Sequence, residues 1–226
     1  MRVSVLVVTV AVLWAAFASA DYYDPPEGWS DNPYFTHQQW EFSTSQNPSA
    51  PEPGYENPNG EPSAYVYGDA IWIYDPSAYV PTDRRGMWVV GGFDVGTSAS
   101  VDLTIPNAPL LPEKLVWLQI TYFLTGAPGA SYSAELVPSG DESVSVVPDS
   151  EVAYAVPGES GWFYYEKMWS IQPQPTEEVI TATINLPAGA VFAMDEAVVD
   201  TICIPEPATL GLLALGGVVA LRRKRK

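Results

Sequence analysis

Apolar and polar side chains alternate along much of the chain between residues 64 and 204. A period of two is typical of a β-strand, because successive side chains point to opposite faces. The clearest case covers residues 114–125, with one side formed by Val116, Leu118, Ile120, Tyr122 and Leu124. Shorter runs bounded by Pro, Gly, Asn or Asp predict strands at residues 36–43, 65–67, 71–74, 87–95, 99–105, 132–137, 143–147, 161–171, 178–186, 190–194 and 197–203.

These strands predict an all-β fold. No convincing apolar period of an amphipathic helix occurs among them. Many short strands with Pro and Gly between them are typical of an antiparallel β-sandwich, and we expect it to be jelly-roll-like. We assign this domain to residues 64–204. Residues 21–63 hold eight prolines among many aromatic side chains, which predicts a loop-rich Pro/aromatic-rich N-terminal arm.

The first 20 residues have the pattern of a secretory signal peptide. Arg2 provides a basic start, residues 3–16 are apolar, and Ala18 and Ala20 form a small-residue cleavage site before Asp21. We therefore expect export through the general secretion machinery and removal of residues 1–20 by signal peptidase.

The last 22 residues, 205–226, contain three parts in order. Pro205, Glu206 and Pro207 come first, and residues 208–221 form an apolar run. The basic end that follows consists of Arg222, Arg223, Lys224, Arg225 and Lys226. Fourteen residues of helix reach about 21 Å, so the run predicts a single short transmembrane helix. Its basic end stays in the cytoplasm, which leaves the N-terminus and the sandwich outside.

This order of parts resembles the sorting tail of PEP-CTERM proteins. The resemblance implies that the membrane enzyme exosortase reads Pro205, Glu206 and Pro207 and cuts the chain near them. Residues 208–226 are then a temporary anchor or a discarded segment. The family consists of exported proteins of bacteria that make an exopolysaccharide matrix, so the resemblance implies a place at the cell surface or in a biofilm matrix. The alternative is a simple single-pass anchor in which Pro207 starts the helix.

The formal charge of −17 is unevenly distributed along the 226 residues. Both ends are basic, whereas residues 21–204 hold 26 carboxylates against the four bases Arg84, Arg85, Lys114 and Lys167. A domain near −22 argues against a nucleic-acid partner and against direct binding to an anionic polymer. It favours a soluble exported domain.

Candidate catalytic chemistry is sparse. The chain has one histidine, His37, and one cysteine, Cys203, so it has no intramolecular disulfide and too few ligands for a zinc site. We predict no catalytic residue and a protein that is not an enzyme. Two carboxylates suffice for glycoside hydrolysis, however, and Glu166 is the acid that we single out for this less favoured alternative.

We predict no required cofactor and assign no metal site. Calcium is the candidate ion, because it takes carboxylate and carbonyl oxygens. The candidate contributors are Asp141 and Glu142, or Asp195 and Glu196 near the last strand.

Residues 161–169 form the strand richest in aromatic side chains. Its alternation places Trp162 and Tyr164 on one face and Trp169 on the other. One row is a candidate platform for stacking sugar rings, with Trp162, Tyr164 and Trp169 as the contact residues. In the alternative, the opposite sheet covers one row and the N-terminal arm covers the other.

The sequence thus predicts an exported cell-surface or matrix protein with a non-enzymatic structural or binding β-sandwich. The first alternative is a carbohydrate-binding module for exopolysaccharide, with calcium as a candidate stabilising ion. The second is a glycan-active enzyme that uses two carboxylates.

Overall fold

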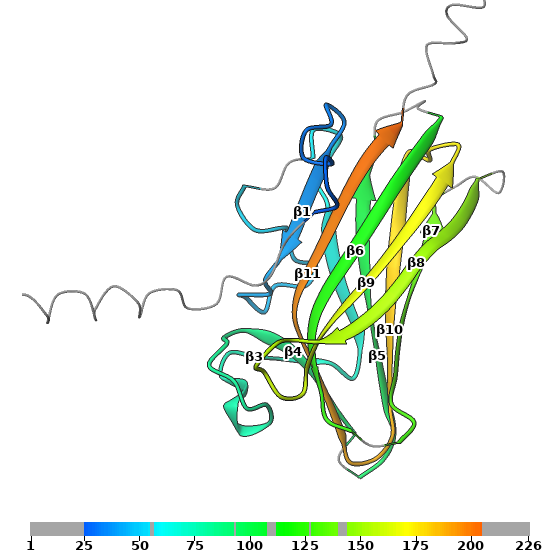
Figure 1. The fold of residues 1–226 in the computed structure, drawn as a ribbon. Helices are drawn as coiled ribbons and strands as arrows, with labels where there is room; N and C mark the ends of the chain where they lie inside the picture. Colours follow the sequence, from blue (N-terminus) through cyan, green and yellow to red (C-terminus); the bar gives the residue numbers. More distant parts are fainter. Residues whose placement is uncertain are drawn as a thin grey trace, which may run out of the picture.

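The computed structural model describes residues 25–54, 57–92, 94–107, 112–126, 128–139 and 144–204. The predicted signal peptide and sorting tail lie outside these residues. Within them the chain forms two antiparallel sheets that pack as layers (Figure 1). This arrangement confirms the predicted all-β, sandwich-like fold class.

The larger sheet has seven strands in the order β3-β4-β11-β6-β9-β8, with β1 also paired to β11. Its strands are β1 (Thr36–Trp40), β3 (Ile71–Ile73), β4 (Met87–Gly92), β6 (Glu113–Leu124), β8 (Ser145–Ala155), β9 (Trp162–Gln172) and β11 (Ala190–Ile204). A short 3-10 helix, η1 (Pro76–Ala78), lies in the connection between β3 and β4.

The smaller sheet has four strands in the order β2-β5-β10-β7. They are β2 (Ser63–Gly68), β5 (Thr97–Pro106), β7 (Ser131–Pro138) and β10 (Glu177–Leu186). Strands β4 to β7 alternate between the two sheets along the chain, which is compatible with jelly-roll-like connections.

Strand β11 is continuous, although its sequence predicts two strands at 190–194 and 197–203. The pairing with β6 shifts register between Met194 and Glu196, so Asp195 is the extra residue of a β-bulge. Met194 and Ala197 both belong to the core between the sheets. The bulge therefore turns both acids, Asp195 and Glu196, to the outer face of the larger sheet, and the break in alternation that it causes explains the wrong prediction.

Strand β8 continues to Ala155, whereas the sequence predicts its end at residue 147. Pro148 suggested a stop, but it lies at a register shift in a strand at the edge of the sheet. A proline at an edge bulge does not interrupt the sheet, because its missing N–H group is not needed for pairing. The strand is exposed along nearly all its length.

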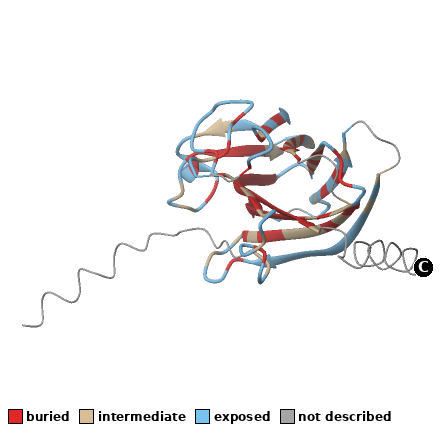
Figure 2. Cartoon of the chain, turned by 90° about the horizontal axis from the view of Figure 1, so that it is seen from above, coloured by how far each residue is buried: buried red, intermediate tan, exposed pale blue. Residues whose placement is uncertain are grey.

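The core lies between the sheets and follows the predicted alternation (Figure 2). Apolar side chains of β5 and β10 face those of β6, β9 and β11. One end of this core is aromatic, with ring contacts that join Tyr122, Tyr132, Phe163, Tyr165 and Phe192. Burial of these rings, together with the aliphatic side chains of the same cluster, stabilises the layer arrangement.

Polar contacts also cross from one sheet to the other at this end. The Tyr165 hydroxyl accepts a hydrogen bond from the N–H of Ala134 at 3.3 Å and donates one to Glu151 at 2.9 Å. Lys167 donates to the carbonyl oxygen of Ala134 at 2.9 Å and pairs with Glu151 at 2.8 Å. The hydrogen bond from Lys167 holds the pKa of Glu151 below its usual value. These contacts fasten β9 to β7.

Tyr132 provides a test of the aromatic core. Its hydroxyl is buried without a partner among the described residues, although part of the side chain is exposed, and burial raises its pKa well above the usual value. Above pH 10 the unfolded chain releases this proton while the folded chain keeps it, so stability falls by up to about 1.4 kcal/mol per pH unit. We expect Tyr132→Phe to be at least as stable as the wild type at pH 7 and to lose less stability by pH 11.

Urea unfolding at pH 7, 9 and 11 measures this difference. Tyr65→Phe, which changes an exposed tyrosine, is the matched control and should leave the stability at pH 7 unchanged. A Tyr132→Phe variant that is clearly less stable at pH 7 would contradict the assignment of an unpartnered hydroxyl.

Candidate functional site

The outer face of the larger sheet is covered at two places by loops. Near β4 and β9, Val80 packs onto a second apolar cluster that includes Met87, Trp162 and Tyr164. Farther along the sheet, Trp29 of the N-terminal arm packs onto Trp117, Val198 and Ile202, and Met168 contacts this third cluster. These loops cover parts of the outer face over β4, β6, β9 and β11, whereas the edge strand β8 stays exposed.

The three predicted sugar-stacking residues, Trp162, Tyr164 and Trp169, are all buried. Trp169 belongs to the core between the sheets, whereas Trp162 and Tyr164 lie beneath the loop that carries Val80. A buried ring offers no face to a sugar, so the prediction of an exposed aromatic row on β9 is wrong. The alternative, in which both rows are covered, describes the structure, with the loop after η1 contributing to the cover as well as the arm.

A hollow of about 290 Å³ lies beside this loop cover. Residues 81–84 form one wall, residues 158–160 form the other, and Trp162 contributes to the lining. Asp83, Arg84 and Glu159 bring charged groups to it.

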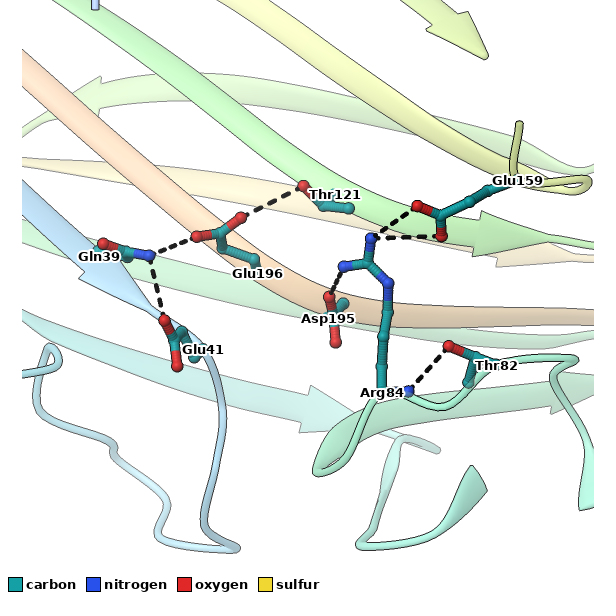
Figure 3. A network of polar contacts seen from close by, with 8 residues as sticks. All are labelled: Gln39, Glu41, Thr82, Arg84, Thr121, Glu159, Asp195 and Glu196. Atoms are coloured by element: carbon teal, nitrogen blue, oxygen red, sulfur yellow. Dashed lines mark hydrogen bonds and ion pairs between the residues drawn. The ribbon is translucent and has the colours of Figure 1, made fainter. Parts of the chain in front are cut away.

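Arg84 organises the polar contacts next to the hollow (Figure 3). Its guanidinium group is buried, forms an ion pair with Asp195 of the bulge, and reaches both carboxylate oxygens of Glu159 at 3.3 Å. The guanidinium carbon also lies 4.5 Å from the centre of the Trp162 ring. Sequence reasoning missed this role, and the available signal was that Arg84 is one of only four bases between residues 21 and 204.

Glu196, the second acid of the bulge, is bound from the neighbouring strands. Its carboxylate accepts a hydrogen bond from Gln39 of β1 at 2.5 Å and one from Thr121 of β6 at 3.4 Å (Figure 3). Gln39 also donates to Glu41 at 3.4 Å. The two bulge acids thus hold the loop after η1 and strand β1 against the sheet.

These contacts bear on the calcium candidates. Asp195 faces a guanidinium group, and Glu196 accepts hydrogen bonds from protein donors. Within the part of the chain that the structure describes, no three His, Cys, Asp or Glu side chains are grouped to hold a metal ion. Asp141 and Glu142 lie outside the described residues.

The other candidate reactive groups have separate surroundings. His37 Nδ1 lies 2.9 Å from a carboxylate oxygen of Asp200 on the outer face, while Cys203 lies on the inner face of the same strand. Burial raises the pKa of the Cys203 thiol, and the Lys114 ammonium acts against this. Glu166 accepts a hydrogen bond from the Tyr154 hydroxyl. The structure therefore does not bring His37 and Cys203 together.

The smaller sheet has an exposed outer face, which sequence reasoning did not select. Tyr65 and Tyr67 of edge strand β2 are 39% and 46% exposed, and their ring centres lie 4.2 Å apart with a tilt of 33°. In register beside them, β5 places Asp102 opposite Tyr65 and Ser100 opposite Tyr67. The same face continues over β10 and β7 with Thr181, Thr183, Ser133 and Glu135. The alternation within residues 65–67 was the signal for the tyrosine pair.

The sorting and export residues cannot be placed beside these sites. Pro205, Glu206, Pro207, the basic end, and Ala18, Ala20 and Asp21 all lie outside the described residues. The same holds for the predicted membrane helix at 208–221, and the residues that are described include no helix long and apolar enough to cross a membrane.

Comparison with known proteins gives few matches. No curated protein matches the chain. Among solved structures, the carbohydrate-binding module TmCBM61, determined with β-1,4-galactotriose, is 12% identical with a TM-score of 0.34, covering 60% of this chain and 86% of the module. The enzymatically active domain of bacteriophage CBA120 tailspike protein 4 is also 12% identical, with a TM-score of 0.30, covering 76% of this chain and 20% of that one. Similarities this low carry no argument about function.

The Arg84 contacts generate a stability prediction. Arg84→Met leaves the buried Asp195 carboxylate without its ion-pair partner, so we expect a loss of about 3–5 kcal/mol in the free energy of unfolding. Arg85→Met is the matched control, because Arg85 pairs with Asp75 at the exposed surface and should contribute less than about 1 kcal/mol. Urea unfolding measures the free energy of unfolding of both variants. Equal effects of the two substitutions would show that the buried pair does not hold the loop.

The end of the chain matches a known family model. Residues 204–226 match the family model of the PEP-CTERM protein-sorting motif. The matched segment starts at Ile204, the last residue of β11, and contains the Pro-Glu-Pro sequence, the apolar run and the basic end. The chain is therefore a PEP-CTERM motif-containing protein, exported and sorted by exosortase.

Proposed function

We propose that the β-sandwich is a non-enzymatic binding domain that the sorting tail delivers to the cell surface or extracellular matrix, and that its ligand is exopolysaccharide. The observation that carries this proposal is the exposed tyrosine pair on the polar outer face of the smaller sheet. Aromatic rings pack against the C–H groups of sugars, and neighbouring hydroxyl and carboxylate groups accept or donate hydrogen bonds.

The geometry of this face suits an extended chain of sugar units. Tyr65 and Tyr67 occupy one edge of it, and Asp102 accepts a hydrogen bond from Thr181 on the next strand at 2.8 Å. Polar side chains on β5, β10 and β7 continue from the tyrosine pair across the sheet. A polysaccharide can therefore stack on the edge and lie across several hydrogen-bonding groups.

The negative charge of the domain favours a neutral polysaccharide. Residues 21–204 contain 26 carboxylates and four bases, so the domain repels an anionic polymer. A neutral polysaccharide avoids this repulsion. An acidic one would need divalent cations between polymer and protein.

The proposed route to the surface uses both ends of the chain. Signal peptidase removes residues 1–20, and residues 208–221 hold the exported chain in the membrane until exosortase acts at Pro205, Glu206 and Pro207. The basic residues at 222–226 keep their end in the cytoplasm. The sandwich is then retained at the surface or enters the matrix.

The tyrosine pair gives the binding test. We expect the protein to bind neutral polysaccharides on a glycan array and the Tyr65→Ala/Tyr67→Ala variant to bind about tenfold more weakly, because it loses roughly 1.5 kcal/mol of aromatic contact. Tyr74→Ala, which removes an exposed tyrosine after β3, is the control and should bind as the wild type does. Absence of binding to every neutral and acidic polysaccharide would leave a purely structural domain as the conclusion.

The sorting motif gives a processing test. Replacement of Pro205, Glu206 and Pro207 by Ala should trap the full-length chain in the membrane fraction, because exosortase no longer reads the motif. Thr209→Ala, just beyond the motif, should be processed normally. Mass spectrometry of the exported protein shows which ends are present. Recovery of wild-type protein that still ends at Lys226 from the mature pool would rule out cleavage.

A further inference from the structure

Three polar side chains are buried together where strands of both sheets begin or end. Asn107 follows β5, Lys114 is the second residue of β6, and Glu178 is the second residue of β10. They are 7%, 1% and 0% exposed. Their neighbours on the inner faces are fully buried apolar residues, namely Ile105, Val116, Ile171 and Ile180. The cluster therefore lies among apolar side chains at one end of the core.

Each of the three side chains contacts the other two. Lys114 Nζ donates to Glu178 Oε1 at 2.5 Å and also to Asn107 Oδ1. Asn107 Nδ2 donates to Glu178 Oε2 and, at 3.1 Å, to the carbonyl oxygen of Pro175. The Asn107 backbone N–H donates to the carbonyl oxygen of Thr176 at 2.9 Å, which holds the residue in place. An amine, a carboxamide and a carboxyl group thus form a closed triangle.

This triangle contains every group that amide exchange requires. We propose that Lys114 and Asn107 become joined by an isopeptide bond, with Glu178 carrying the protons. A proton passes from the Lys114 ammonium to Glu178 Oε1, and the freed amine attacks Cγ of Asn107. In the tetrahedral intermediate Glu178 gives this proton to Nδ2 through Oε2 and takes the second proton of Nζ through Oε1. Ammonia then leaves, the Nζ–Cγ amide is complete, and Glu178 ends as the neutral acid. Lysine and asparagine side chains give a secondary amide and ammonia, and no oxidant or other reactant is consumed.

The surroundings align the reacting groups. The partners are held in contact by three separate strands, so the reaction needs no encounter step. Glu178 contacts the attacking group with one oxygen and the leaving group with the other. The same carboxyl group can therefore remove and supply the proton.

The position of the bond gives it a structural consequence. Asn107 follows a strand of the smaller sheet and Lys114 belongs to the larger one, so the bond joins the two layers. Lys114 pairs in register with Cys203 of β11, two residues before Pro205 of the sorting motif. The chain's only cysteine cannot provide an intramolecular disulfide. An isopeptide bond supplies a covalent cross-link at the end of β11, which lies toward the top in Figure 1.

Tryptic peptide mapping of the full, folded chain tests the proposal. Without the bond, trypsin cuts after Lys114 and yields the two peptides 86–114 and 115–167. With the bond, Lys114 resists cleavage and a single peptide 86–167 is recovered that is lighter by one ammonia, about 17 Da. Fragmentation of this peptide should locate the branch between Asn107 and Lys114. A succinimide at Asn107 would also lose ammonia but would leave Lys114 cleavable, so the two readouts together identify the bond.

Variants separate the role of each group. Glu178→Gln keeps the size of the side chain but cannot carry the protons, and Lys114→Arg has no nucleophilic amine, so both should give two separate peptides of full mass. Lys167→Arg is the control, since Lys167 pairs with Glu151 outside the triangle, and its map should retain the linked peptide. Wild-type protein with a β-type circular dichroism spectrum whose Lys114 is cleaved at full mass would overturn the proposal. A linked Glu178→Gln protein would overturn the role of Glu178.

Discussion

The structure depends on the contact between two antiparallel sheets. The chain has a single cysteine, so neither sheet is fastened by an intramolecular disulfide, and the buried apolar faces provide most of the stabilisation. Polar contacts between the two sheets occur at two places. Tyr165 and Lys167 bind Ala134 near the aromatic end, and Lys114, Glu178 and Asn107 meet where the sorting tail begins. Both sets of contacts link the two sheets.

The two outer faces of the sandwich differ because of one bulge in β11. The bulge turns Asp195 and Glu196 outward, where they bind Arg84 of a loop and Gln39 of β1. Loop and arm then cover the aromatic side chains of the larger sheet. The smaller sheet leaves Tyr65 and Tyr67 exposed, and for this reason the proposed ligand site lies there. The sorting motif and the proposed ligand site thus lie in separate parts of the chain.

The alternation of apolar residues predicted most strands, because one face of each is buried. It could not show that β11 continues through Asp195, since a bulge removes the alternation on which the prediction rests. It also could not show what covers Trp162, because the covering residue Val80 belongs to a loop. The pattern did not predict the contact among Asn107, Lys114 and Glu178 for a related reason. They are up to 71 residues apart, and only the strand order brings them together.

The proposed isopeptide bond makes the polar contact between the sheets at the tail end covalent. A high-resolution crystal structure of the exported protein tests it most directly. We expect continuous electron density between Lys114 Nζ and Asn107 Cγ at the length of an amide bond, about 1.33 Å. A separate ammonium and carboxamide at hydrogen-bonding distance, about 2.7 Å or more, would contradict it.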